Sequence, residues 1–154
     1  MNHIVGDRFW AKVNKTDGCW NWTAAKARGY GRFKIEGKLQ YAHRLAYQGF
    51  VGAIPTGMLV DHICRNRACV RPSHLRLATT KQNLENLSGS NRGSTSNVRG
   101  VSWYSRDKKW QAKLGHNYKT LHLGYYDNVA DAEAVVIAKR NELFTHNDVD
   151  RVAR

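Results

Sequence analysis

The stretch from Leu59 to Asn86 gathers the side chains of this sequence that are best suited to chemistry. It reads LVDHICRNRACVRPSHLRLATTKQNLEN and contains an Asp-His pair, two cysteines, a second histidine and three asparagines. Ordinary cores and surfaces have little reason to collect these residue types in so short a segment. The stretch therefore predicts a functional site.

Three of these side chains are spaced like ligands of a zinc ion. Four residues separate Cys64 from Cys69, and four more separate Cys69 from His74. Zinc favours thiolate and imidazole ligands, and a loop with this spacing can bring them to one point. Three cysteines are an odd number, which argues against a disulfide framework. Cys19 is the cysteine that remains, so it is the predicted fourth ligand; the alternative is that all three cysteines are small buried hydrophobic residues.

A candidate catalytic set flanks the zinc ligands. His62 lies near the end of the apolar segment LVDHI, and a neutral imidazole can take a proton from water, as hydrolysis of a phosphodiester requires. Asp61 and Asn83 carry oxygen atoms, the ligands that a hard cation such as Mg²⁺ needs. Such a cation would neutralise charge on the scissile phosphate and the leaving oxygen. An Asp-His pair alone is usually structural, but the added asparagine makes the combination specific.

The net charge points to a polyanionic partner. The chain has 25 Lys and Arg residues against 12 Asp and Glu residues, a formal charge of +13. An excess of this size attracts nucleic acid, with an anionic membrane surface as the alternative. We find no apolar run long enough for a membrane span and no amphipathic basic helix. The N-terminus lacks the pattern of a secretory signal, so we expect an intracellular protein without a membrane partner.

The elements that must position these residues follow from local patterns. A short helix is predicted over 7–13, strands over 18–25 and 29–35, and a strand followed by a helix over 38–48. In the core stretch the order is strand (59–63), loop (64–73), strand (75–79) and a short helix capped by Thr79 or Thr80. The predicted fold class is α+β.

A second module is predicted beyond a linker. Residues 88–97 are almost entirely Gly, Ser, Asn and Thr and cannot bury apolar area, so they mark a flexible domain boundary. Three strands are expected over 98–105, 109–116 and 119–126, and a helix with Asp127 or Asn128 as N-cap over 127–144. Residues 145–154 are expected to be a frayed tail.

The core stretch resembles the HNH, or His-Me finger, endonucleases of the phage and homing types. The likeness to their zinc-containing members rests on the pattern H-I-C-x4-C-x-x-P-x-H-L from His62 to Leu75, and it extends to 18–20, 29–31 and 42–44. The resemblance implies a nuclease domain over 1–87 with a ββα-metal core and a structural zinc. It also implies the cytoplasm of a bacterial host if the protein is phage-encoded.

The resemblance assigns roles to individual residues. His62 matches the general base, and Asn83 and Asp61 match the ligands of a catalytic Mg²⁺. The zinc ligands correspond to Cys19, Cys64, Cys69 and His74. Arg44 can stabilise charge on the scissile phosphate, or it can lie on a helix surface and pair with a carboxylate. Three further basic residues fit contacts to backbone phosphates: Arg28, Arg32 and Lys34.

Residues 98–144 resemble the AP2 DNA-binding domain, in which a three-stranded sheet packs on one helix. The matching residues are Arg99-Gly100-Val101, Trp110-x-Ala112, Leu123-Gly124-x-Tyr126 and the Ala-rich helix from about Ala130. The family reads DNA with arginines and tryptophans of its sheet, which here match Arg99, Trp103, Arg106, Lys108, Trp110 and Lys113. The alternative for the tryptophans is that one or both belong to the core. The sheet segment 98–126 is basic and 127–154 is acidic, as expected if the sheet faces DNA.

These observations favour a metal-dependent, site-preferring DNA endonuclease of the homing type that acts on double-stranded DNA. Its first domain would cut and its second would select the site. A homodimer would suit a double-strand cut by a protein with a single active site. One alternative is a non-catalytic zinc-containing DNA-binding regulator. A further alternative is a non-specific or RNA-directed nuclease, for which the second module would be superfluous.

Overall fold

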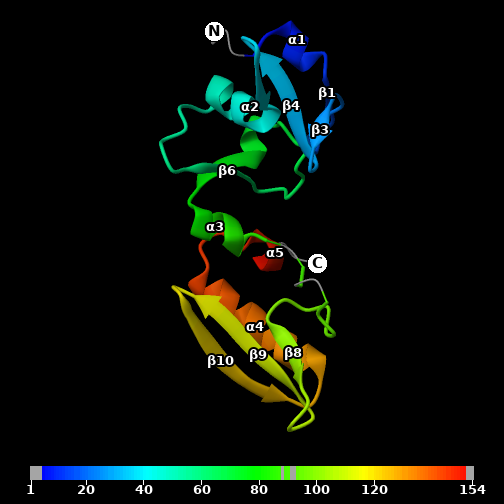
Figure 1. The fold of residues 1–154 in the computed structure, drawn as a ribbon, viewed down its shortest axis with the longest axis vertical. Coiled ribbons are helices and arrows are strands. Elements are labelled where there is room, and N and C mark those ends of the chain that lie inside the picture. The colour runs from blue at the N-terminus through cyan, green and yellow to red at the C-terminus, as the bar shows by residue number, and fades with distance from the viewer. Residues whose placement is uncertain (1–4, 88, 91–92, 152–154) are drawn as a thin grey trace. The chain divides into compact units, whose positions relative to one another are not determined.

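The computed structural model describes residues 5–87, 89–90 and 93–151, and the chain divides into two compact units, Met1–Asn83 and Leu84–Arg154 (Figure 1). Each unit combines helices with antiparallel strands. The mixed helix-and-strand composition predicted from the sequence is therefore confirmed. None of the helices in the described ranges combines the length and the apolar character that crossing a membrane requires.

The first half of the first unit is built on short strands around an aromatic core. Its elements are α1 (Asp7–Trp10), β1 (Val13–Lys15), β2 (Trp20–Trp22), β3 (Lys26–Ala27), β4 (Tyr30–Ile35), β5 (Lys38–Tyr41) and α2 (Ala42–Phe50). Strand β4 pairs with β3 on one side and β5 on the other. The predicted first helix is shorter than expected, because Val13 instead pairs with Trp22 across the β1–β2 ladder.

Three aromatic rings form the centre of this core. The Phe9 ring lies 5.0 Å from Trp22 and 5.3 Å from Phe33, and Trp22 lies 5.8 Å from Phe33. Phe9 and Trp22 are fully buried. Gly31 in β4 lies against the Trp22 indole, where a Cβ would come within 2.6 Å of Cγ. The glycine is therefore required for the close approach of strand and ring.

The core stretch folds in the predicted order of strand, loop, strand and helix. Its elements are β6 (Leu59–His62), the 3₁₀ turn η1 (Pro72–His74), β7 (Leu75–Ala78) and α3 (Thr80–Glu85). Strands β6 and β7 are antiparallel, with His62 opposite Leu75. Helix α3 begins with a capping box: the Gln82 amide donates to Thr79 Oγ1 at 3.2 Å, and the Thr79 amide donates to Gln82 Oε1 at 2.9 Å. This hairpin places Asp61 and His62 on a buried strand.

The second unit contains a three-stranded antiparallel sheet with one long helix against it. The strands β8 (Val101–Tyr104), β9 (Lys109–His116) and β10 (Lys119–Tyr126) are ordered β10-β9-β8, and α4 (Val129–Leu143) follows. Helix α4 lies against this sheet (Figure 1). Buried Val101, Ala112, Ala132 and Val136 form the core of the second unit. As predicted, Asn128 caps the helix by accepting the Asp131 amide. The likeness to AP2 domains stays a prediction.

The C-terminal segment differs from the frayed tail that the sequence predicts. Residues Asp148–Arg151 form a short helix, α5, and Asp150 makes an ion pair with Arg140 at 2.8 Å, both side chains being buried. The Thr145 amide donates to Glu85 Oε2 at 2.9 Å. The prediction of a frayed tail is therefore wrong for 145–151, because residues of this segment bond to Glu85 and Arg140. Residues 152–154 lie outside the described residues.

The predicted linker, 88–97, is only partly described, since residues 88 and 91–92 lie outside the described ranges. Near its end, the Ser96 hydroxyl donates to the Val101 carbonyl at 2.6 Å and accepts the Val98 amide at 3.1 Å. These bonds tie Ser96 to the start of the sheet.

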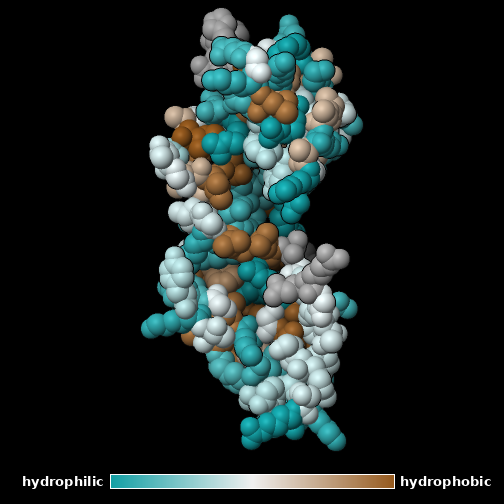
Figure 2. Space-filling view, in the orientation of Figure 1, coloured by the Kyte–Doolittle hydropathy of each residue, from teal (hydrophilic) through white to brown (hydrophobic). Residues whose placement is uncertain are grey.

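On the face drawn in Figure 2, hydrophilic residues predominate, which agrees with the charge of +13.

Candidate functional site

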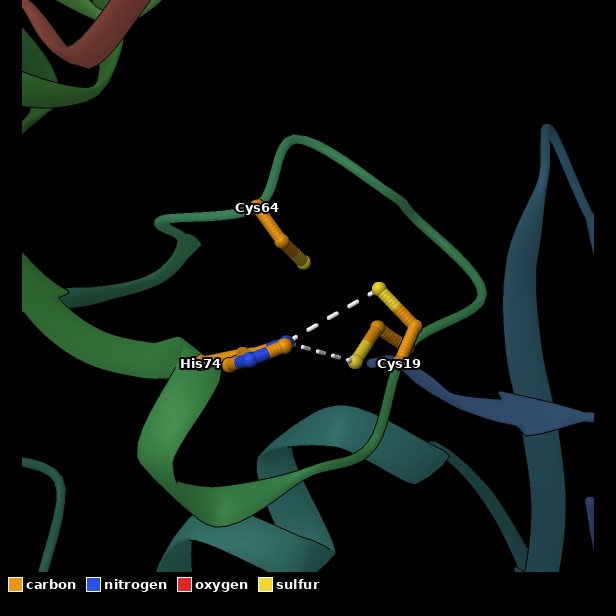
Figure 3. Close-up of side chains that lie close together, drawn as sticks. Cys19, Cys64 and His74 are labelled. Carbon is orange, nitrogen blue, oxygen red and sulfur yellow. Dashed lines mark hydrogen bonds between the residues drawn. The ribbon is translucent and has the colours of Figure 1, made fainter. Parts of the chain in front are cut away.

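Four potential metal ligands lie together in the first unit. The ligand atoms of Cys19, Cys64, Cys69 and His74 are all within 4.8 Å of one another. His74 Nδ1 lies 3.7 Å from the Cys19 sulfur and 3.6 Å from the Cys69 sulfur (Figure 3). A zinc ion bonded to sulfur at about 2.3 Å and nitrogen at about 2.0 Å in a tetrahedron would set such atoms roughly 3.5 Å apart. The residues therefore fit a tetrahedral metal ion.

Backbone pairing brings the distant Cys19 to this cluster. Strand β2 lies along the loop between β6 and η1: the Trp22 amide donates to the Ala68 carbonyl, and the Val70 amide donates to the Trp20 carbonyl, each at 2.8 Å. Asn21 and Cys69 form the β-bridge between these two bonds. Cys19 immediately precedes β2, so this register carries its thiol to the loop cysteines.

One cysteine of the cluster, Cys69, is shifted toward the thiolate form that metal binding requires, while its neighbour Cys64 is held as a thiol. The Cys64 thiol donates to Cys69, which lowers the pKa of Cys69 to about 4 and raises the pKa of Cys64. The Arg71 amide also donates to the Cys69 sulfur at 3.4 Å. A thiolate at Cys69, together with two further cysteines and one histidine, is a ligand set that binds zinc in preference to hard cations.

His62 is buried and is held by the same loop. Its Nε2 lies 3.0 Å from the Cys69 carbonyl oxygen. A carbonyl can only accept, so Nε2 carries the proton and the lone pair of the neutral ring is on Nδ1. Burial is the main cause that lowers the pKa of His62, opposed by the hydrogen bond to Cys69. The ring is therefore neutral near pH 7, in the form that a general base needs.

A second histidine packs against His62. The His43 ring, near the start of α2, lies 4.7 Å from the His62 ring and 5.3 Å from Tyr30. Tyr41 lies 5.6 Å from His43 on another side. Burial, followed by the influence of His62 and Arg44, lowers the pKa of His43 to about 3. The sequence pattern AHR gave no sign that this histidine would join the predicted catalytic residue.

Asp61 and Asn83 are the predicted ligands of a hard cation. Asp61 is buried on β6, and its Oδ2 accepts bonds from Arg76 Nε at 3.1 Å and Nη2 at 3.0 Å. Asn83 lies half-buried on α3, where its backbone amide donates to the Thr79 carbonyl at 2.9 Å. Carboxylate and amide oxygens fit the preference of Mg²⁺ for oxygen donors. Arg76, across the β6–β7 ladder, was missed from the sequence as a partner of Asp61.

The predicted phosphate-binding residues of the first unit lie on the β3–β4–β5 ribbon and on α2. The Arg32 guanidinium stacks on Tyr41 at 4.3 Å, and Lys34 and Arg28 are exposed on the β3–β4–β5 ribbon. Arg44 is half-buried on α2 and acts electrostatically on His43. Arg67 in the metal-ligand loop, which the sequence gave no reason to single out, stacks on Tyr30 at 5.4 Å.

The predicted DNA-binding residues of the second unit differ in their burial and in their partners. The half-buried Arg99 donates to the backbone carbonyls of Leu84, Glu85 and Leu87, so its guanidinium caps the end of α3. Trp110 packs on the core, whereas Trp103 is 45% exposed and meets the Trp110 ring edge at 5.0 Å. The remaining three basic residues are exposed: Arg106, Lys108 and Lys113.

The sequence gave no signal for a polar cluster on the sheet. The Gln111 side chain lies 2.9 Å from His122 Nε2 and donates to the Tyr125 hydroxyl at 3.0 Å. The Tyr125 ring in turn lies 5.1 Å from Tyr104. Gln111 alternates along β9 with Ala112, which packs toward α4, so this cluster lies on the opposite face of the sheet.

Comparison with known proteins supports a nuclease domain in the first unit. Residues 40–85 match the family model of HNH endonucleases, a range that includes every singled-out residue of the core stretch but not Cys19. The match supports a nuclease domain at this place in the chain. It ends before the sheet of the second unit begins.

Three phage proteins are similar to parts of the chain. Protein 7.7 of Escherichia phage T7 is 43% identical over 70 residues, covering 45% of this chain and 54% of the relative. Protein 2.8 of the same phage is 35% identical over 75 residues (47% and 50%), and Protein 3.8 is 29% identical over 86 residues (53% and 70%). The chain spans about half the length of the first two. No solved structure matches at a comparable level of significance.

Proposed function

We propose that this protein is an HNH-type DNA endonuclease that hydrolyses phosphodiester bonds, with His62 as general base. The observation that carries the proposal is the buried His62 ring, which donates from Nε2 to Cys69 and so keeps its lone pair on Nδ1. A neutral base fixed in one tautomer can accept a proton from water at neutral pH. The family match over residues 40–85 supports the same activity.

Two metals have separate places in this proposal. A structural zinc would be held by Cys19, Cys64, Cys69 and His74, whose donor atoms are already gathered. Asp61 and Asn83 would hold Mg²⁺, which would supply Lewis acidity to the scissile phosphate. The pairing of Asp61 Oδ2 with Arg76 keeps the carboxylate oriented on β6.

The second unit would deliver the nuclease to preferred sites, as in homing-type enzymes. Its sheet segment is basic, with Arg106, Lys108 and Lys113 exposed. Arg99 and Trp110 are less suited to contact DNA than the sequence suggests, because they cap α3 and pack on the core. Linking a binding module to a cutter raises the local concentration of the cutter at its target.

A plasmid-cleavage assay tests the proposal. Wild-type protein and His62→Ala are compared with and without Mg²⁺, and His146→Ala, in the second unit, serves as the histidine control. We expect metal-dependent nicking or cleavage by the wild type and the control, and none by His62→Ala, while binding of His62→Ala to DNA persists. DNA binding by the wild type without cleavage in Mg²⁺, Mn²⁺ or other divalent cations would instead favour a non-catalytic regulator.

A further inference from the structure

We propose that Arg67, in the loop between Cys64 and Cys69, is a catalytic residue that binds the scissile phosphate beside His62. The inference rests on the proposed nuclease function and names the protein group that contacts its substrate. It differs from the sequence-based expectation, in which Arg44 was the candidate for this contact.

The Arg67 side chain is held in a defined place. Its guanidinium stacks on the Tyr30 ring at 5.4 Å, and Nη1 donates to the Arg28 carbonyl at 3.4 Å. Its aliphatic part lies on Gly29, where a Cβ would come within 3.4 Å of Arg67 Cδ. An arginine restrained in this way loses less conformational freedom when it binds a ligand than a free surface arginine does.

Tyr30 connects Arg67 to the catalytic histidine. The same ring that carries the Arg67 guanidinium lies 5.9 Å from the His62 ring. The positive charge of Arg67 acts on the His62 imidazole, whereas that of Arg44 acts on His43. Arg67 is therefore linked to the residue that receives the proton from water through a shared aromatic ring.

Among the residues that the structure describes, Arg67 has no anionic partner. Its guanidinium is exposed. Other arginines are engaged: Arg76 pairs with Asp61, and Arg71 donates to the carbonyls of Asp17 and Gly18. A planar guanidinium with donors to spare matches the oxygens of a phosphodiester.

The proposed step balances without a proton from Arg67. The oxygen of water bonds to phosphorus, its proton passes to Nδ1 of His62, and one phosphorus–oxygen ester bond breaks. The leaving oxygen finally takes a proton from solvent. Arg67 would donate hydrogen bonds to the non-bridging oxygens, whose negative charge grows in the transition state.

A matched pair of variants tests the inference. Arg67→Gln and Arg65→Gln each remove one positive charge from the same loop. Arg65 contacts His62 through its backbone amide, which donates to the His62 carbonyl at 2.9 Å and is retained in Arg65→Gln. Cleavage rates are measured at saturating DNA, together with DNA affinity and bound zinc. We expect Arg67→Gln to lower kcat by roughly 10²-fold or more, Arg65→Gln to leave kcat within about twofold, and both to weaken DNA binding to a similar small extent.

Arg67→Lys refines this result, because it keeps the charge but loses the planar pair of donors. Its kcat should lie between those of the wild type and Arg67→Gln. Equal kcat for Arg67→Gln and Arg65→Gln in an active wild-type background overturns the inference and leaves the nuclease function intact. An inactive wild type overturns both.

A second experiment leaves Arg67 unchanged, so its result does not depend on whether an Arg67 variant folds. In His62→Ala, the Nε–Hε signal of Arg67 is followed by NMR while a duplex containing the mapped cleavage site is added. We expect a large shift of this signal at saturation. An unmoved signal on a protein that binds the duplex means that Arg67 does not contact the DNA, and it rejects the proposal.

Discussion

The imidazole of His62 donates from Nε2 to the carbonyl oxygen of Cys69 at 3.0 Å, and the thiol of Cys69 belongs to the four-residue metal cluster. One residue thus connects a candidate structural metal to the candidate base. Loss of the metal should therefore disturb the orientation of His62 as well as the fold.

Replacement of Cys19 by serine should abolish metal binding by the cluster. Serine is a poor zinc ligand, and structural zinc contributes several kcal/mol to the stability of small domains. We expect Cys19→Ser to lose its zinc, to unfold at a clearly lower temperature and to cleave no DNA, although His62 and Asn83 remain. Metal content and thermal unfolding measure the effect. Ser73→Ala, at an exposed position of η1, is the control. A Cys19→Ser variant with full zinc would refute the assignment of the fourth ligand.

The stability of the first unit should fall between pH 7 and pH 5 because of His43. The folded protein holds the pKa of His43 at about 3, mainly by burial, while the unfolded chain has the ordinary value of 6.5. Below pH 6.5 the unfolded chain therefore binds a proton that the folded chain refuses, so the free energy of unfolding decreases as the pH falls. For one histidine this loss is about 2 kcal/mol between pH 7 and pH 5.

His43→Gln should remove this part of the pH dependence. Denaturant unfolding of the zinc-loaded wild type and variant at pH 5, 6 and 7 gives the slope of the free energy of unfolding against pH for each protein. The difference between the two slopes does not depend on the packing cost of the substitution, because that cost is the same at every pH. His146→Gln, in the second unit, is the control. Parallel pH profiles for the wild type and His43→Gln would show that His43 titrates normally in the folded state.

Gly31→Ala should destabilise the first unit. The new Cβ would come within 2.6 Å of Cγ and 2.7 Å of Cδ1 in the Trp22 ring, which is fully buried and cannot yield. Overpacking of this kind costs about 1–3 kcal/mol. Denaturation followed by tryptophan fluorescence gives the change. Gly18→Ala, whose Cβ would meet its nearest atom at 3.9 Å, should be close to neutral; equal stability of the two variants would contradict the packing described for Trp22.

Asp150→Asn should destabilise the second unit. Asp150 and Arg140 are both about 95% buried at their side chains, and removing one charge leaves the other unpaired. Breaking a buried pair costs about 3–5 kcal/mol. Glu142→Gln disrupts an exposed pair with Lys139 and should cost less than about 1 kcal/mol. If thermal unfolding shows Asp150→Asn to be as stable as Glu142→Gln, then 148–151 is not fixed in solution.

Local patterns in the sequence predicted most elements but not all of their bounds. The Thr79–Gln82 capping box and the Asn128 cap are local interactions, so the sequence identifies both helix starts. Helix α1 ends early because Val13 pairs with β2, a partner that no window around Val13 contains. The Arg140–Asp150 pair is similarly invisible in a tail whose composition is polar.

The candidate site shows the same limit. Its ligand types could be inferred because cysteine and histidine are few and their spacing is regular, and the structure brings Cys19 to the three others. The surroundings of the site depend on folding: Arg76 reaches Asp61 across a ladder, and His43 reaches His62 from a separate helix. Arg99 resembles a DNA contact in sequence, but only the fold reveals the three carbonyls that it caps.

The bridge between Asn21 and Cys69 also bears on the order of assembly. Hydrogen bonds on either side of it, from Trp22 to Ala68 and from Val70 to Trp20, hold the ligand loop on β2 through backbone groups and not through the metal-ligand side chains. The four donor atoms can thus be collected before any ion arrives, which makes metal loading a late event. We therefore expect the cluster to exchange zinc for Co²⁺ or Cd²⁺ in the folded protein, with the spectrum of a tetrahedral thiolate site appearing without an unfolding phase.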